Sequence, residues 1–185
     1  FGVSGCLPMY RTDAIRRASE RGELFDGSYR TYKEDVDLAY RLQALGATAV
    51  VLPEARAYHR RSVGVGITTP RSPEAVYHSY RNHLWVLAAH LELRALLGSR
   101  AGVLPYEAVK IAFWLITRPR LLARALLETR AHWPMLMQKR AFVRMLRAAR
   151  PAHATEERPD VDLAIVMVSH NDLNAACLAS LAAAR

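Results

Sequence analysis

The chain has 185 residues, of which 51% are hydrophobic and 23% are charged, and its net charge is +9. This composition is that of a folded protein and excludes an intrinsically disordered chain. The longest apolar runs, residues 84–89 and 111–116, fall far below the roughly 18 residues expected of a membrane span. Cys6 and Cys177 lie far apart, so no disulfide framework is expected and a reducing cytosol is the default compartment.

The positive charge is concentrated in one segment. Residues 71–150 carry 14 Lys and Arg against four Glu, a net charge of +10, while the rest of the chain sums to −1. This distribution indicates an anionic partner for that segment, which is a lipid headgroup, a nucleic acid or a phosphate-bearing substrate.

In chain order, the first part alternates short strands with helices. After a glycine-containing loop we expect a strand at Leu7–Tyr10 and a helix from Thr12 or Asp13 to about Ser19. The apolar spacing then predicts a helix over 33–45, with Gly46 as its stop. Short strands are expected at Ala47–Leu52 and Ala55–Arg60, followed by a Gly- and Pro-rich loop over 63–73.

The second part is predicted to be helical from about residue 73 to 150. We expect breaks near residues 98–102, at Pro119 and at Pro134. After a polar linker, the apolar run 163–168 is typical of a buried strand, and an Ala- and Leu-rich helix follows it to the end. A strand, a short polar loop and a helix are the way an open α/β sheet begins.

Three carboxylates crowd the first turn of the predicted helix 33–45, namely Glu34, Asp35 and Asp37. Asp35 is the best candidate for a general base, because the positive end of a helix keeps a carboxylate ionised and able to accept a proton. The alternative is that these acids only stabilise the start of the helix, as acids commonly do. Asp37 is expected to pair with Arg41, four residues later, in either case.

A second group of candidate residues ends the strand predicted at 55–60. His59 is a candidate ligand for a divalent metal, although a strand histidine more often makes an ordinary hydrogen bond. Arg60 and Arg61 are suited to holding a diphosphate, or they are solvated charges.

The helices predicted over 118–150 interleave apolar and basic residues. Apolar and basic faces with tryptophan are typical of a helix that lies in a membrane interface. A helical subdomain that packs on its neighbour and turns a basic face to solvent explains the pattern equally well.

Several sequence blocks, taken in order, resemble a known family. These blocks are Ser4–Cys6, Met9–Arg11, Leu24–Asp26, Tyr32–Leu42, Leu45–Gly46, Pro53–Ala55 and Tyr58–His59. Their order and spacing resemble the C-terminal half of a glycosyltransferase family 2 catalytic domain of the bacterial rhamnosyltransferase-like kind. The resemblance covers about residues 1–150, and Ser79–His83 resembles the helical tail that these enzymes often carry.

The resemblance implies a GT-A fold and an inverting transfer of a sugar from a nucleotide-sugar donor to a polysaccharide or lipid-linked acceptor. By this resemblance Asp35 is the catalytic base with Glu34 beside it, and Gly5 and Cys6 border the acceptor pocket. His59 would complete a site for a divalent metal, Mg or Mn. The Asp-X-Asp metal motif of the family is expected upstream, so this chain alone is not expected to bind donor or turn over.

Residues 161–185 have a resemblance of their own, to the opening strand and helix of another family 2 domain. The expected architecture is therefore α/β, with a partial GT-A (Rossmann-like) half-domain, a membrane-associated helical tail and an isolated strand–helix unit. The expected boundaries are 1–70 for the half-domain, 71–150 for the basic amphipathic helices, 151–160 for a linker and 161–185 for the second domain. The parent protein would be a tandem glycosyltransferase, cut at both ends.

The leading interpretation is thus a glycosyltransferase fragment, cytoplasmic and peripheral at the inner face of the plasma membrane. The alternative is a non-catalytic basic helical module that binds anionic membrane or nucleic acid and leaves Asp35 without a role. A nucleic-acid partner is disfavoured, because the chain lacks a recognisable binding fold and clustered stacking aromatics. A third interpretation, a metal-dependent phosphohydrolase, needs more ligands than the chain supplies.

Overall fold

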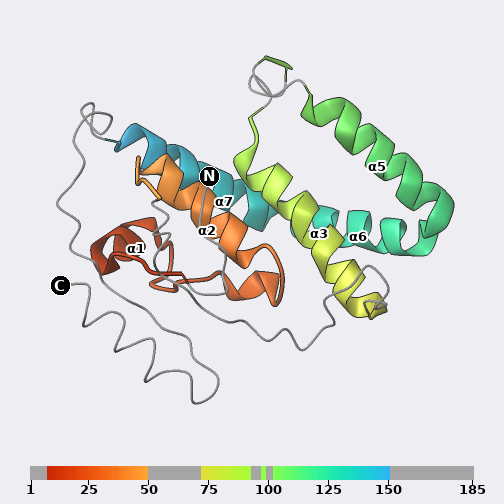
Figure 1. Cartoon of the computed structure of the whole chain (residues 1–185), viewed down its shortest axis with the longest axis horizontal. Coiled ribbons are helices and arrows are strands. Elements are labelled where there is room, and N and C mark those ends of the chain that lie inside the picture. Colours follow the sequence, from red (N-terminus) through yellow and green to blue (C-terminus); the bar gives the residue numbers. More distant parts are fainter. Residues whose placement is uncertain (1–7, 50–71, 93–96, 99–101, 151–185) are drawn as a thin grey trace, which may run out of the picture.

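The computed structural model describes residues 8–49, 72–92, 97–98 and 102–150. These residues form helices joined by short turns (Figure 1). The elements are α1 (Thr12–Ala18), the short 3₁₀ turn η1 (Gly27–Tyr29), α2 (Glu34–Ala44), α3 (Pro73–His90), α5 (Val103–Thr117), α6 (Pro119–Ala131) and α7 (Trp133–Ala148).

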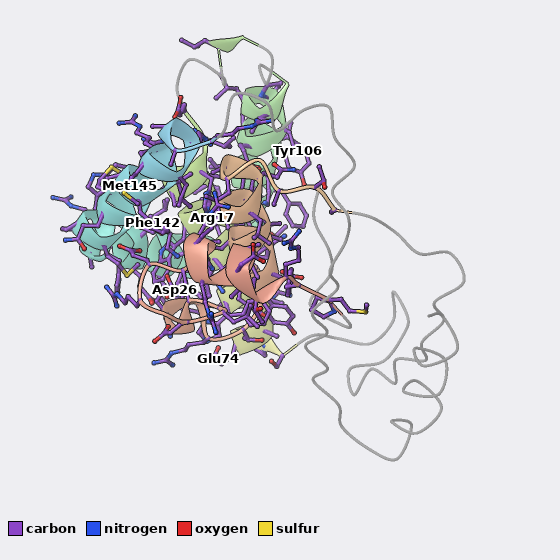
Figure 2. All side chains as sticks on the ribbon, turned by 90° about the vertical axis from the view of Figure 1, so that its left-hand side faces the viewer. Arg17, Asp26, Glu74, Tyr106, Phe142 and Met145 are labelled. Atoms are coloured by element: carbon purple, nitrogen blue, oxygen red, sulfur yellow. The ribbon has the colours of Figure 1, made fainter. Side chains whose placement is uncertain are left out.

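The long helix α3 organises the bundle. It packs against α2 and α7 on one side and against α6 on the other. The helix α2 lies along α7 and also contacts α1, while α5 packs on α6 at the edge of the molecule far from α1 (Figure 1). The side chains between these helices fill the interior of the bundle, and Met145 of α7 lies at its outer edge (Figure 2).

The predicted α/β fold class is wrong for the described residues, of which 74% are helical and none is in a strand. Residues 8–10, expected in a strand, have no regular secondary structure, and Tyr10 is buried among apolar side chains of α1, α2 and α7. Residues 47–49 are an exposed segment after α2. A short apolar run has the same sequence signature whether it pairs in a sheet or packs singly on helices, which explains the error. The strands expected at 55–60 and 163–168 lie outside the described residues.

The helical predictions that fall on described residues are confirmed, and the helix expected after residue 168 lies outside them. The helix predicted at 33–45 is α2, and Gly46 follows it with a φ of +82°, a left-handed conformation that suits glycine. Helices fill most of the described part of 73–150, and the chain breaks at Pro119 and near Pro134, where prolines occupy the first turns of α6 and α7. At the start of α3, the Ser72 hydroxyl accepts a hydrogen bond from the Ala75 amide at 3.1 Å.

The apolar interior of the described part has three clusters. The first joins α1, α2 and α7, the second joins η1, α3 and α7, and the third joins α3 and α6. Their buried members are Tyr10, Ala18, Leu38, Ala44, Leu45, Val143 and Leu146, then Tyr29, Trp85, Val86 and Leu136, then Tyr77, Tyr80, Leu122 and Ala125. The apolar faces of α6 and α7 therefore contribute to the core, as the packing interpretation of 118–150 expected.

Leu136, fully buried between η1, α3 and α7, provides a test of this core. Leu136→Ala should lower the free energy of unfolding by about 2–5 kcal/mol, because the substitution removes buried methyl groups and leaves a cavity. Urea denaturation followed by circular dichroism measures this change. Leu127→Ala on α6 is the matched control, since Leu127 is 67% exposed. Equal losses in the two variants would contradict the described packing.

Candidate functional site

The first turn of α2 sends its carboxylates in different directions. Asp37 is completely buried toward α3 and α7, whereas Glu34 and Asp35 are half-buried. Positions two residues apart on a helix point to nearly opposite sides, which explains why Asp35 and Asp37 have different surroundings. Burial, and after it the charge of nearby Asp35, raises the pKa of Tyr10 to about 12.

Asp37 is the centre of a buried polar network. Its Oδ1 accepts hydrogen bonds from His90 Nε2 at 2.8 Å, from Lys139 Nζ at 3.1 Å and from Tyr29 Oη at 3.3 Å. Its Oδ2 accepts from Arg41 Nε at 2.9 Å. The predicted pairing of Asp37 with Arg41 is confirmed, while the sequence pattern gave no sign of His90 or Lys139, which lie 53 and 102 residues away.

The network keeps Asp37 ionised. Burial opposes the charged carboxylate, but the hydrogen bond from His90 and the charges of Lys139 and Arg41 outweigh it and hold the pKa of Asp37 well below its usual range. Burial lowers the pKa of His90, so the imidazole stays neutral beside the two cations. Arg41 also donates to the Ala18 carbonyl at 2.6 Å and to the Leu24 carbonyl at 3.2 Å, and Lys139 also pairs with Asp26. Asp37 is therefore a structural carboxylate that holds the helices together.

The loop that leads into α2 has an unusual backbone. Arg30, Tyr32 and Lys33 all have positive φ angles, of 61°, 68° and 72°. Residues other than glycine rarely adopt this conformation, so the loop must be held by its surroundings. Such local strain is concentrated at functional sites in proteins.

Arg81 and Asn82 of α3, which we call the Arg81–Asn82 clamp, hold this loop. Asn82 Nδ2 lies 2.8, 2.7 and 2.7 Å from the carbonyl oxygens of Tyr29, Thr31 and Tyr32, so its two hydrogens serve three acceptors. Arg81 donates to Asn82 Oδ1 from Nε at 2.9 Å and from Nη2 at 2.7 Å, which fixes the orientation of the amide. The clamp thereby sets where the first turn of α2 begins.

Contacts on α3 and α6 in turn position Arg81. Arg81 Nη1 donates to Glu128 Oε1 at 2.6 Å, and the Tyr77 hydroxyl donates to the other oxygen of the same carboxylate. The guanidinium also lies over the ring of Trp85, 4.2 Å from its centroid. Sequence reasoning placed Ser79–His83 only within a helical tail, because contacts across some 50 residues leave no local pattern.

Glu34 and Asp35 begin the helix that the clamp positions. Asp35 Oδ1 accepts a hydrogen bond from the Val36 amide at 2.8 Å, which turns the carboxylate toward the helix N-terminus. Burial raises the pKa of Glu34, and the charge of Asp35 adds to this effect. Glu34 Oε2 is buried and has no hydrogen-bond partner among the residues that the structure describes.

A groove between α3 and α5, the α3–α5 groove, lies beside the start of α2. It is lined by Lys33 from the loop, by Tyr80 and His83 of α3, and by side chains of α5 that include Lys110 and Trp114, with Arg118 at its end. His83 Nε2 lies 2.7 Å from Glu107 Oε1, and burial followed by the charge of Lys110 lowers the pKa of His83. Three cations and four aromatic side chains, Tyr80, Tyr106, Phe113 and Trp114, suit this groove to an anionic or sugar-bearing ligand.

Other candidate residues from the sequence lie outside the described residues. These are His59, Arg60 and Arg61, together with Gly5 and Cys6. Within the described ranges, no three His, Cys, Asp or Glu side chains gather closely enough to hold a metal ion. Glu34 and Asp35 alone are too few for a divalent cation, so the Mg or Mn site remains a prediction that needs His59 or other ligands.

No family model, curated protein or solved structure matches this chain. Functional inference therefore depends on the sequence blocks and on the geometry of the site.

The Arg81–Asn82 clamp predicts a specific effect of Asn82→Asp. The substitution keeps the shape of the side chain but removes the hydrogens that three carbonyls share. It should lower the free energy of unfolding by about 1–3 kcal/mol and accelerate hydrogen exchange at the amides of residues 33–37. Gln138→Glu on α7, the same chemical change at an exposed position, should alter neither quantity. Unchanged exchange in Asn82→Asp would show that the loop does not depend on the clamp.

The lowered pKa of Asp37 predicts how the free energy of unfolding depends on pH. Its pKa in the folded protein is below the unfolded value of about 3.9, so the unfolded state binds the proton first as the pH falls. This contribution is present at neutral pH and should be lost progressively below about pH 5. Asp37→Asn should lower the free energy of unfolding by about 3–5 kcal/mol at pH 7, because it leaves buried cations without their anion. The variant should also lose less stability than wild type as the pH falls below about 5.

Urea denaturation at a series of pH values measures both effects. Asp13→Asn is the control, because the Asp13 side chain is 59% exposed on α1. If wild type and Asp37→Asn lost the same amount of stability below about pH 5, Asp37 would not be the group responsible for this loss.

Proposed function

We propose that the chain is part of an inverting glycosyltransferase that uses Asp35 as its general base. The donor is a nucleotide-sugar, and the acceptor is a hydroxyl of a polysaccharide or lipid-linked sugar. The observation that supports this most is the loop of positive φ angles before α2, held by the Arg81–Asn82 clamp. A protein that maintains backbone strain at the start of one helix gains a fixed position for Glu34 and Asp35.

The chemistry of Asp35 is that of a proton acceptor. As the acceptor oxygen attacks the anomeric carbon, its proton passes to the Asp35 carboxylate and a new carbon–oxygen bond forms. The bond from that carbon to the diphosphate breaks, and the nucleoside diphosphate leaves with the electron pair. Attack from the face opposite the leaving group inverts the anomeric centre. General base catalysis of this kind contributes about 10²–10⁴-fold to the rate.

Neighbouring residues have supporting roles in the proposal. Glu34, whose pKa burial raises, is suited to hydrogen bonding with the acceptor sugar beside Asp35. The α3–α5 groove, with Lys33 at its edge, is suited to the rest of the acceptor. A divalent metal would neutralise charge on the departing diphosphate, but the described residues do not hold one by themselves and no step here is assigned to it.

The proposal includes a cytoplasmic location at the inner face of the plasma membrane. Among the described helices, none combines the length and the apolar character needed to cross a bilayer. The exposed apolar surface of α5, described below, favours peripheral contact with the membrane.

The same surface also favours the second candidate, a non-catalytic basic module that binds anionic membrane. That candidate gives Asp35 no role, so a substitution at Asp35 separates the two.

Asp35→Asn should reduce sugar transfer by about 10²–10⁴-fold, since the amide keeps the shape of the side chain but cannot take the proton. The proposal requires an upstream nucleotide-binding half, so transfer is assayed in the longer protein that contains it. Release of nucleoside diphosphate measures the rate, and calorimetry measures donor affinity, which should be unchanged.

Asp13→Asn, a charge removal at an exposed position of α1, is the matched control and should retain full activity. Full activity in Asp35→Asn would remove Asp35 from the mechanism and favour the non-catalytic module.

A further inference from the structure

The helix α5 is almost entirely exposed although its sequence is apolar. None of its 15 residues is buried, and Val109 and Ile116 are 71% and 81% exposed. The other large apolar residues that it exposes are Leu104, Tyr106, Ile111, Phe113 and Leu115. A continuous apolar surface of this kind on a protein marks a site of contact with a partner or a membrane.

The exposed apolar surface covers most of the circumference of α5. On a helix that turns about 100° per residue, these side chains span about 220°. The rest of the circumference faces the bundle, where Trp114 lies against Tyr80 with ring centroids 5.0 Å apart and Glu107 contacts His83. A helix packed into a single protein groove presents a narrower apolar stripe, whereas a helix in a lipid interface is surrounded on several sides.

The charges around α5 favour an anionic surface. Residues 103–127 contain four cations, Lys110, Arg118, Arg120 and Arg124, against one acid, Glu107. Glu107 contacts His83 and Lys110, so Arg118 and Arg120 are the exposed cations without an acid nearby in the sequence. Arg118 and Arg120 are exposed at the corner between α5 and α6, next to the C-terminal end of the apolar surface. Basic side chains beside an apolar helix face are the combination that binds a bilayer containing anionic lipids.

The length of α5 fixes how it meets the bilayer. A helix of 15 residues is about 22 Å long, shorter than the hydrocarbon core of about 30 Å. It is therefore suited to lying in the plane of the interface, with its apolar side chains among the acyl chains and its arginines at the phosphates.

We propose that α5 is the membrane-docking element of this protein and that its partner is the surface of an anionic lipid bilayer. Phe113, Ile116 and their neighbours enter the interface, and Arg118 and Arg120 contact lipid phosphates. This inference deepens the membrane part of the proposed function, but it does not depend on Asp35 or on sugar transfer. It also moves the membrane contact from residues 118–150, whose apolar face is largely in the core, to residues 103–120.

Cosedimentation of the full chain with vesicles tests the proposal. Wild type should bind vesicles of phosphatidylglycerol and phosphatidylcholine much more tightly than vesicles of phosphatidylcholine alone. Phe113→Ser with Ile116→Ser should weaken this binding at least tenfold, since two side chains no longer transfer into the interface. Arg118→Gln with Arg120→Gln should weaken it about 30-fold, and added salt should reduce that difference.

Matched controls come from other surfaces of the bundle. Met145→Ser removes an apolar side chain that is 56% exposed on α7, and Arg16→Gln with Arg17→Gln removes two exposed charges on α1. Both should bind vesicles as wild type does. All variants change exposed residues, and unchanged circular dichroism and thermal midpoints confirm that each is folded.

Several outcomes would overturn the proposal. Equal binding of wild type and the α5 variants to anionic vesicles would show that another surface makes the contact. Duplex DNA that displaces the protein from the vesicles at equal phosphate concentration would assign the cations to nucleic acid. Dimers in wild type that dissociate in Phe113→Ser with Ile116→Ser, without lipid binding, would assign the apolar surface to a second copy.

Asp35→Asn separates this inference from the proposed function. It should bind vesicles as wild type does, whereas Ile116→Ser, at a position that does not line the α3–α5 groove, should weaken vesicle binding and retain transfer to a soluble acceptor.

Discussion

The buried carboxylate of Asp37 constrains how the helices α2, α3 and α7 pack. An isolated buried charge costs far more than a small domain can tolerate, so Asp37 must be surrounded by donors. Those donors come from α2 itself, from η1, from α3 and from α7, and each must reach within hydrogen-bond distance of the same two oxygens. Few packings of the three helices meet that requirement, which explains how a small bundle acquires one defined geometry.

One turn of α3 connects that geometry to the site. Arg81 and Asn82 face the strained loop before α2, while Tyr80 and His83 face α5 and line the α3–α5 groove. The loop before α2 and the α3–α5 groove are therefore held by successive residues of one helix. A rigid element of this kind preserves the spacing of the parts that it holds.

The sequence predicted the features that are local in the chain. The bounds of α2, its stop at Gly46 and the pairing of Asp37 with Arg41 follow from helical spacing and are confirmed. The α/β class failed for the described residues because Tyr10 and residues 47–49 belong to segments without regular secondary structure, which pair with no strand. His90, Lys139 and Asn82 could not be foreseen, since their partners are more than 40 residues away. Nor does composition tell which of several apolar helices stays outside the core.

The distance in sequence between Asp37 and Lys139 has a consequence for biosynthesis. The two residues are 102 positions apart, so the ribosome completes α2 well before it adds the cation from α7. Until then Asp37 lacks one of its charged partners and the apolar side of α3 lacks Leu136. Long-range contacts of this kind slow folding and leave nascent chains open to aggregation or to chaperones. A translational pause before α7 would lengthen that exposure.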